Sequence, residues 1–334
     1  MLTELKKVER QAISQAADLL AAGEVVAFPT ETVYGLGADA LNSAAVAKIF
    51  AAKGRPADNP LIVHLYQAEQ AEALAYTNEL FYTLAKAFWP GPLTLIVPKK
   101  DCVPAIVTAG LDSVALRVPA HPAARWLLQA GKMPLAAPSA NSSGKPSPTL
   151  ADHVYQDLQG KIPLILDGGA VNIGLESTVV SLVSSPPAIL RPGKISYAEL
   201  LPYLPNLLPP KALAAAEAPR SPGMKYTHYS PQGQVLLAAG GAVFLKAYRS
   251  LPKDKKLFII ATSQTAALLP QEAAPFVIAQ TGDIQAYAHN IFAAFRSADA
   301  AGAELILTET VPVQNDDVSM AIMNRLNKAA GIGS

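Results

Sequence analysis

The sequence has a single cysteine, little excess of either charge and no long apolar run. Cys102 is the only cysteine among 334 residues, which excludes an internal disulfide and a cysteine-rich zinc site and suits a reducing compartment. Lysine and arginine number 27 against 26 acidic residues, so we do not expect direct, stable binding of nucleic acid. No apolar run reaches the roughly 18 residues of a membrane span, and we predict a cytoplasmic protein.

Signatures of several enzyme classes are also missing. There is no Gly-x-Ser-x-Gly or His-Glu-x-x-His motif, and the five histidines are scattered. Gly144-Lys145 does not belong to a P-loop, because Ser139 and Pro146 occupy the positions where that motif needs glycine and a hydroxyl residue. No Gly-x-Gly-x-x-Gly fingerprint of dinucleotide binding occurs. These absences favour a reaction without a covalent protein nucleophile.

Apolar patterns predict an α/β (α+β) chain. In the first half, a strand is expected over 24–28 and a helix over 43–52, after the capping residue Asn42. Residues 4–10 and the alanine-rich stretch behind them resemble an amphipathic helix, not a signal peptide. After a cluster of prolines, short apolar runs alternate with helices such as 284–301, which is typical of a parallel α/β domain.

The composition divides the chain into three parts. We predict a twisted open sheet in a catalytic domain, a proline-rich linker and a smaller Rossmann-like domain, over residues 1–205, 206–232 and 233–334. The second domain carries no motif that we can interpret.

Two polar segments gather cations and hydroxyl groups. Lys53 and Arg55 follow the predicted helix, and the proline after Arg55 favours extended backbone, in which residues two apart point to the same side. Their charges are therefore expected to converge on a phosphate or carboxylate. A solvated helix end is the alternative. The proline-bounded segment 139–147 is expected to present Ser139 and Asn141 on one side, toward phosphate or nucleotide hydroxyls.

Two further loops have a composition that suits ligand binding. Thr30 and Thr32 follow the predicted strand with the same parity, and nearby glycines permit close approach of the backbone, although an ordinary turn has the same composition. The linker ends in residues 221–231, where two tyrosines, a histidine and a lysine stand together. We predict that this segment closes over the site as a lid, with Tyr229 near the phosphates; packing against a domain interface is the alternative.

Eight ordered blocks resemble the two-domain threonylcarbamoyl-AMP synthases, in which a YrdC-like domain precedes a C-terminal extension. The family pairs Lys-x-Arg with Ser-x-Asn, and both pairs are intact here. The resemblance covers the whole chain and implies a YrdC-like fold for the first domain. Its blocks are PTETVYGLGADA (29–40), KGRPADNPLIVHL (53–65), FWPGPLTLIV (88–97), ALRVPAHP (115–122), APSANSSGKPSPT (137–149), GLESTVVSL (174–182), ILRPGKIS (189–196) and SPGMKYTHYSP (221–231).

The resemblance implies a nucleotidyltransferase reaction. The amine of L-threonine captures carbon dioxide or bicarbonate as a carbamate, the carbamate oxygen attacks the α-phosphate of ATP, and pyrophosphate leaves. Mg²⁺ bound with ATP helps to neutralise the phosphates. The product passes to a tRNA threonylcarbamoyl transferase complex, which modifies an adenosine next to the anticodon.

The resemblance also implies a set of site residues, with no metal ligand identified in the protein. His64 lies in an apolar run and has the alternative of a satisfied core histidine, and Arg191 that of a surface turn residue. The implied catalytic residues are Lys53, Arg55, Ser139 and Asn141; the ATP-binding residues are Arg55, Asn59, Ser113, Ser139, Ser147, Arg191 and Tyr229; and the threonine-binding residues are Thr32, His64, Arg117 and Ser177.

Two other functions compete with the synthase. A carbamoyl-transfer enzyme with a related domain would carry cysteine-rich zinc modules, which this chain cannot build. A non-enzymatic RNA-binding module is disfavoured by the balanced charge.

Overall fold

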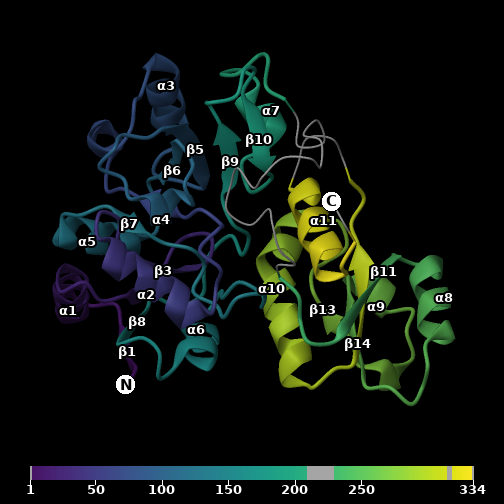
Figure 1. Cartoon of the computed structure of the whole chain (residues 1–334). Helices are drawn as coiled ribbons and strands as arrows, with labels where there is room; N and C mark the ends of the chain where they lie inside the picture. The colour runs from purple at the N-terminus through teal and green to yellow at the C-terminus, as the bar shows by residue number, and fades with distance from the viewer. Residues whose placement is uncertain (1, 209–228, 314–317, 333–334) are drawn as a thin grey trace.

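Two sheets divide the protein, and a computed structural model describes residues 2–208, 229–313 and 318–332 (Figure 1). No helix in those ranges combines the length and apolarity needed to cross a membrane. The strands of the first part are β1 (Glu4–Lys7), β2 (Val26–Pro29), β3 (Tyr34–Asp39), β4 (Ile62–His64), β5 (Leu93–Pro98), β6 (Ser113–Arg117), β7 (Leu135–Ala136), β8 (Leu164–Asp167), β9 (Thr178–Ser181) and β10 (Ala188–Arg191). Its helices are α1 (Arg10–Ala21), α2 (Ser43–Lys53), α3 (Glu79–Phe88), α4 (Ala105–Thr108), α5 (Pro122–Gly131), α6 (Ala151–Leu158) and α7 (Tyr197–Leu200), with the 3₁₀ helix η1 (Ala68–Ala73).

The second part is a smaller parallel α/β unit. Its strands lie in the order β11-β14-β12-β13, whereas the first sheet is mixed and runs β1-β8-β2-β3-β7-β4-β6-β5-β9-β10. The predicted fold class is confirmed. The elements of the second part are β11 (Gln234–Ala239), α8 (Ala242–Ser250), β12 (Leu257–Ala261), α9 (Ser263–Ala266), η3 (Gln271–Ala273), β13 (Phe276–Val277), α10 (Ile284–Ala300), β14 (Leu305–Thr310) and α11 (Ser319–Ala329).

The start of the chain differs from the expectation. Residues 4–7 form a strand that pairs in parallel with β8 at the edge of the sheet, and the helix begins only at Arg10. The prediction of a helix over 4–10 is therefore wrong. Charged residues are also typical of edge strands, where they discourage pairing with other chains. A short charged segment alone does not distinguish an edge strand from a polar helix face.

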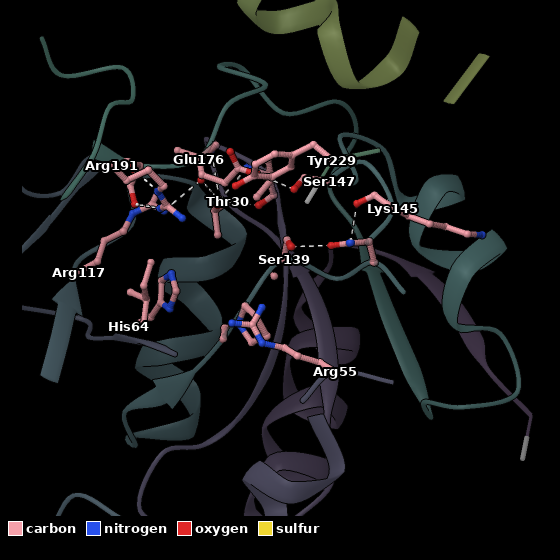
Figure 2. A pocket seen from close by; sticks show the side chains of 18 residues that line it. Thr30, Arg55, His64, Arg117, Ser139, Lys145, Ser147, Glu176, Arg191 and Tyr229 are labelled. Carbon is pink, nitrogen blue, oxygen red and sulfur yellow. Dashed lines mark hydrogen bonds between the residues drawn. The ribbon is translucent and has the colours of Figure 1, made fainter. Parts of the chain in front are cut away.

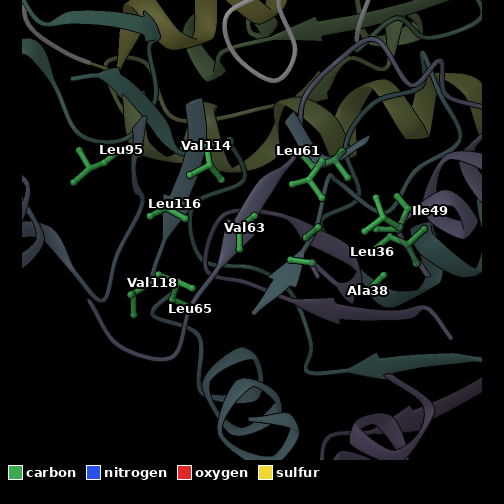
Figure 3. Close-up of a cluster of buried hydrophobic side chains, with 14 of the residues drawn as sticks. Leu36, Ala38, Ile49, Leu61, Val63, Leu65, Leu95, Val114, Leu116 and Val118 are labelled. Carbon is green, nitrogen blue, oxygen red and sulfur yellow. The ribbon is translucent and has the colours of Figure 1, made fainter. Parts of the chain in front are cut away.

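Strand alternation explains how the first sheet holds helices on both faces. Val26 and Phe28 of β2 pack with α1 and α5, whereas Ala27 between them belongs to the core under α2. Figure 3 shows the α2 side of the sheet, where Leu36, Val63 and Leu116 from three strands lie with other buried aliphatic side chains. The carboxyl end of α2 and the loops beside it are thereby fixed on a rigid support.

The second domain packs its α10 and α11 toward the first domain (Figure 1). Val33 and Leu175, from two loops of the first domain, join the hydrophobic cluster of the second. Gly174 allows this approach, since a Cβ there would lie 2.3 Å from the His289 carbonyl oxygen in α10. Arg296 of α10 adds a buried ion pair of 2.9 Å with Asp157 of α6.

Candidate active site

A polar pocket lies between the polar loops of the first domain and Tyr229 (Figure 2). It encloses about 650 Å³, including space open to solvent. Four cationic side chains and one carboxylate line it, and two of the cations, Lys145 and Arg117, are also paired with Asp157 and Glu31 outside the lining. Cationic groups still predominate at the pocket, which suits a polyanion. The lining residues are Thr30, Thr32, Val33, Gly35, Arg55, Ile62, His64, Arg117, Ala137, Pro138, Ser139, Asn141, Lys145, Ser147, Glu176, Ser177, Arg191 and Tyr229.

The end of α2 separates the two cations that were expected to converge. Asn42 caps the start of the helix by accepting from two backbone N–H groups, and Gly54 ends it in a left-handed conformation with φ of 63°. Lys53 is therefore helical, not extended, and its side chain turns into the protein, whereas Arg55 lines the pocket. The predicted extended geometry across residues 53–55 is wrong.

Lys53 holds the loop that carries Ser139 and Asn141. Its Nζ donates to the carbonyl oxygens of these two residues at 2.5 and 2.6 Å. Burial lowers the pKa of the Lys53 ammonium well below its ordinary value, and the charge of Arg55 lowers it further. The Arg55 guanidinium donates to the carbonyl oxygens of Asn59 and Pro60, at 3.2 and 3.4 Å. Lys53 thus shapes the pocket wall from behind.

The Ser-x-Asn segment is pinned by backbone pairing. Gly35 forms an isolated antiparallel bridge with Ser139, so the segment runs alongside β3. The Ser139 hydroxyl donates to Asn141 Oδ1 at 2.5 Å, and Asn141 Nδ2 donates to the Lys145 carbonyl oxygen at 2.8 Å. These bonds bend residues 139–145 into a loop with both functional side chains in the pocket wall.

Arg117 and His64 form the opposite end of the pocket because β4 and β6 are parallel neighbours in register at these residues. Arg117 Nη2 forms a buried ion pair of 2.6 Å with Glu31, and Nη1 donates to Thr32 Oγ1 at 3.0 Å. Nε donates to the carbonyl oxygen of Gly91 at 3.2 Å. These contacts use three of the five guanidinium N–H groups and fix the fork beside the pocket.

The His64 ring is buried in the pocket wall. Its Nδ1 has no hydrogen-bond partner among the described residues, and the side chain is only 4% exposed. Burial lowers the pKa of His64 to about 3, and the Arg117 charge contributes, so the imidazole is neutral at physiological pH. The buried Nδ1 at a pocket surface suits a ligand and favours a binding role for His64 over that of a satisfied core histidine.

Ser177 directly precedes β9, and Arg191 is the last residue of β10. Arg191 is buried and donates from Nε to the Ser177 carbonyl oxygen and from Nη2 to its hydroxyl, both at 3.0 Å. The Ser177 hydroxyl also contacts the Thr94 hydroxyl at 2.7 Å. The alternative of a surface turn residue is therefore wrong for Arg191.

Two buried residues that sequence reasoning did not select, Glu176 and Arg325, connect the pocket to the second domain. Glu176 lines the pocket and accepts from the Ser147 hydroxyl at 2.6 Å and from Arg325 of α11 at 3.0 and 3.1 Å. Burial raises the pKa of Glu176, but the charges of Arg325 and Arg191 and the Ser147 bond more than offset this, so the pKa lies below its ordinary value.

Tyr229 contributes the wall nearest the second domain. Its ring stacks on Phe292 with centroids 5.2 Å apart, and the Arg325 guanidinium lies 5.6 Å from the ring centroid. The backbone N–H of Ser230 donates to the Gly144 carbonyl oxygen at 3.0 Å. Of the predicted lid, residues 221–228 lie outside the described residues, whereas Tyr229 lines the pocket and belongs to the domain interface.

Most of the predicted site residues meet at this pocket. Ser113 does not, because it begins β6 at the end opposite Arg117 and lines a separate surface hollow with Asp112 and Val183. Lys53 and Asn59 are buried behind the wall. Lys145 and Glu31 were missed, although the charged positions of their polar loops were a usable signal. The ten that line the pocket are Thr32, Arg55, His64, Arg117, Ser139, Asn141, Ser147, Ser177, Arg191 and Tyr229.

The described residues contain no group of three or more histidine, cysteine or acidic side chains placed to hold a metal ion. The one carboxylate in the pocket wall, Glu176, is already bound to Ser147 and Arg325.

Comparisons with known proteins cover both domains. One family model, described as telomere recombination, matches residues 18–193, and another, described as the C-terminal domain of threonylcarbamoyl-AMP synthase, matches residues 195–331. The threonylcarbamoyl-AMP synthase of Pyrococcus abyssi is 44% identical over 335 residues, spanning 98% of this chain and 96% of the relative. That of Bacillus subtilis is 45% identical over 328 residues, spanning 96% and 93%. The crystal structure of P. abyssi Sua5 complexed with L-threonine is similar with a TM-score of 0.89 at 42% identity, over 99% of this chain and 97% of that one.

Proposed function

The chain belongs to the threonylcarbamoyl-AMP synthase family, and we propose that its pocket condenses ATP, L-threonine and bicarbonate or carbon dioxide into threonylcarbamoyl-AMP and pyrophosphate. The observation that carries this proposal is the distribution of charge in the pocket, where Arg55, Arg117 and Arg191 line the wall with several hydroxyls and the one lining carboxylate, Glu176, is paired with Arg325. An acidic pocket would repel a nucleoside triphosphate, whereas this one attracts it.

The two ends of the pocket suit the two larger substrates. Arg55 lies in the wall near the Ser-x-Asn loop, where it suits the phosphates of ATP. The Ser147 hydroxyl donates its proton to Glu176, so its oxygen suits a donor group of the nucleotide. Arg117 has guanidinium N–H groups in reserve for the carboxylate of threonine, and the neutral His64 ring beside it offers a polar nitrogen. A similar structure with bound L-threonine supports a threonine site in this fold.

The reaction requires positioning and charge neutralisation, and the residues suit both tasks. The threonine amine adds to carbon dioxide and loses a proton to give a carbamate. A carbamate oxygen then forms a bond to the α-phosphorus of ATP while the bond to the β-phosphate oxygen breaks and pyrophosphate leaves. Arg55 would balance the charge that moves to the leaving group, and the fixed Ser139–Asn141 loop would orient the phosphates.

Magnesium fits this site as part of the substrate. Mg²⁺ is commonly held by substrate phosphates and water with few protein ligands, and the described part of the chain offers no group of three or more histidine, cysteine or acidic side chains placed for a metal ion. We therefore assign it to the MgATP complex, where it screens the phosphate charge, and not to a resident metal centre.

The product is an activated adenylate that needs an acceptor. We propose that a tRNA threonylcarbamoyl transferase complex consumes it in the cytoplasm, to modify an adenosine next to the anticodon. This assignment rests on the family and on the chemistry of the product.

The decisive assay is pyrophosphate release from MgATP with L-threonine and bicarbonate, with each component omitted in turn. We expect release to require both threonine and bicarbonate and the adenylated product to have the mass of threonylcarbamoyl-AMP. Release that does not require threonine would contradict the proposed function.

A further inference from the structure

We infer that Arg325, in the last helix of the second domain, is a positioning residue for the nucleotide side of the pocket and acts through Glu176 on Ser147. The inference rests on the proposed function, because it takes Ser147 as a contact of ATP. It extends that function by giving the C-terminal domain a direct part in building the site.

The path from Arg325 to the pocket contains only two hydrogen-bonding steps. Arg325 donates from Nε and Nη2 to Glu176 Oε2, and the other carboxylate oxygen, Oε1, accepts from Ser147 Oγ. Each oxygen of Glu176 therefore has a separate task, one toward the second domain and one toward the pocket. The orientation of the carboxylate, and with it that of the Ser147 hydroxyl, depends on where Arg325 lies.

Arg325 is itself held firmly. Its side chain is fully buried, and Nη1 donates to the carbonyl oxygen of Pro192 at 2.7 Å, next to the pocket residue Arg191. Its guanidinium also faces the ring of Tyr229. One side chain of the second domain thus touches Glu176, the strand end after Arg191, and Tyr229, which bound the same side of the pocket.

A guanidinium can fix the orientation of the Glu176 carboxylate, whereas a simple positive charge cannot. A planar fork can bond a carboxylate and a backbone carbonyl at fixed angles, whereas the lysine ammonium is a mobile point charge. If the guanidinium were removed, Glu176 would lose its main partner in a buried place, where an unpaired carboxylate is unfavourable. The carboxylate would then turn toward Arg191 or take up a proton, and either change alters the bond to Ser147.

Two facts distinguish a positioning role of Arg325 from a role in docking the domains alone. Other residues also join the domains, including Arg296 through Asp157 and an exposed bond between Lys194 and Gln285. The Gln285 contact touches no pocket residue. Loss of docking contacts as such should therefore not change nucleotide affinity selectively, whereas loss of Arg325 should.

The test measures KM for ATP and for threonine, together with the Kd of a non-hydrolysable ATP analogue, in the full-length protein. We expect Arg325→Met to raise the ATP KM and the analogue Kd by about 10- to 100-fold, the range for losing one hydrogen bond to a charged group, with the threonine KM nearly unchanged. Arg325→Lys should fall between Arg325→Met and the wild type. Gln285→Ala, the matched control, should behave as the wild type.

Combined variants test the path. Because Arg325 is inferred to act on ATP through Ser147, Arg325→Met should have little further effect on ATP affinity in a Ser147→Ala background. Glu176→Gln should relieve part of the Arg325→Met defect, because it removes the unpaired buried charge. Equal changes in both KM values, or a lowered thermal midpoint with unchanged ATP affinity, would overturn the inference and leave Arg325 a docking residue. Full additivity of Ser147→Ala and Arg325→Met would overturn it too. The proposed function is judged separately, by the threonine dependence of the wild-type reaction.

Discussion

Replacement of Lys53 by alanine is the sharpest test of how the pocket is built. If the ammonium met the ligand directly, Lys53→Ala would impair turnover and leave the fold intact. In the structure, Nζ instead bonds the carbonyl oxygens of Ser139 and Asn141 from behind the wall. We therefore expect Lys53→Ala to reduce both the stability of the first domain and the rate.

The magnitude follows from the groups left behind. Two buried carbonyls lose their partner, at a cost of about 1–3 kcal/mol each. Part of this is regained, because the variant no longer buries an ammonium whose pKa is lowered by desolvation. A net loss of about 2–4 kcal/mol is expected. Displacement of Ser139 and Asn141 should also reduce the rate by roughly 10²- to 10³-fold, as does removal of other preorganised groups.

Tryptophan fluorescence during urea unfolding measures the stability of the first domain, because both tryptophans, Trp89 and Trp126, lie in that domain. Threonine-dependent pyrophosphate release measures the rate. Lys48→Ala, on the same helix, is the matched control, because its exposed pair with Glu24 should contribute less than about 1 kcal/mol.

Arg55→Ala provides the contrast, because Arg55 lines the pocket. It should reduce the rate by a similar roughly 10²- to 10³-fold with a smaller loss of stability than Lys53→Ala. If Lys53→Ala abolished turnover while its urea midpoint equalled that of Lys48→Ala, Lys53 would act on the ligand itself, and the assignment of a supporting role would be refuted.

Three further outcomes follow from the same structure. The ring signals of His64, whose pKa burial lowers to about 3, should not titrate in NMR spectra between about pH 8 and pH 5, and a midpoint near its ordinary value would contradict its burial. Burial raises the pKa of Asp157, but its bonds and charge interactions with Arg296 and Lys145 bring it below the ordinary 3.8. The stabilising effect of Asp157 is therefore present above that pH and is lost as the pH falls through the lowered pKa. Asp157→Asn should lower the thermal midpoint at neutral pH and flatten its decline below about pH 4. Gly174→Ala should lower the thermal midpoint by weakening domain docking, because the added Cβ would meet the backbone of α10. Gly169 has the same left-handed backbone with no atom within 4 Å of an added Cβ, so Gly169→Ala should lower the midpoint less. Equal losses in thermal midpoint would rule out the steric cause.

The sequence was sufficient for the chemical character of the site. Polar, hydroxyl-bearing loops after apolar strands stand out in a chain that is 16% charged, and the ordered blocks assigned them to one family. Ten of the predicted residues line one pocket, and local signals such as the Asn42 cap and the strand pattern located the segments that carry several of them. Elements with long apolar patterns, such as α10, were likewise predicted nearly to their ends.

Side-chain direction and long-range pairing were beyond the sequence. Lys53 and Arg55 are two positions apart, yet the left-handed turn at Gly54 directs one into the protein and the other to the pocket. The charged start of the chain became an edge strand only because β8 offered it backbone partners.

The sequence by itself determined which residues could hold a triphosphate and an amino acid and which family the chain resembles. The tertiary structure alone decided that Lys53 supports the wall and that Arg325, 149 positions from Glu176, completes it. The physical reason is that residue type and local spacing determine chemical character and backbone propensity, whereas the partner of a buried charge depends on how the two domains dock.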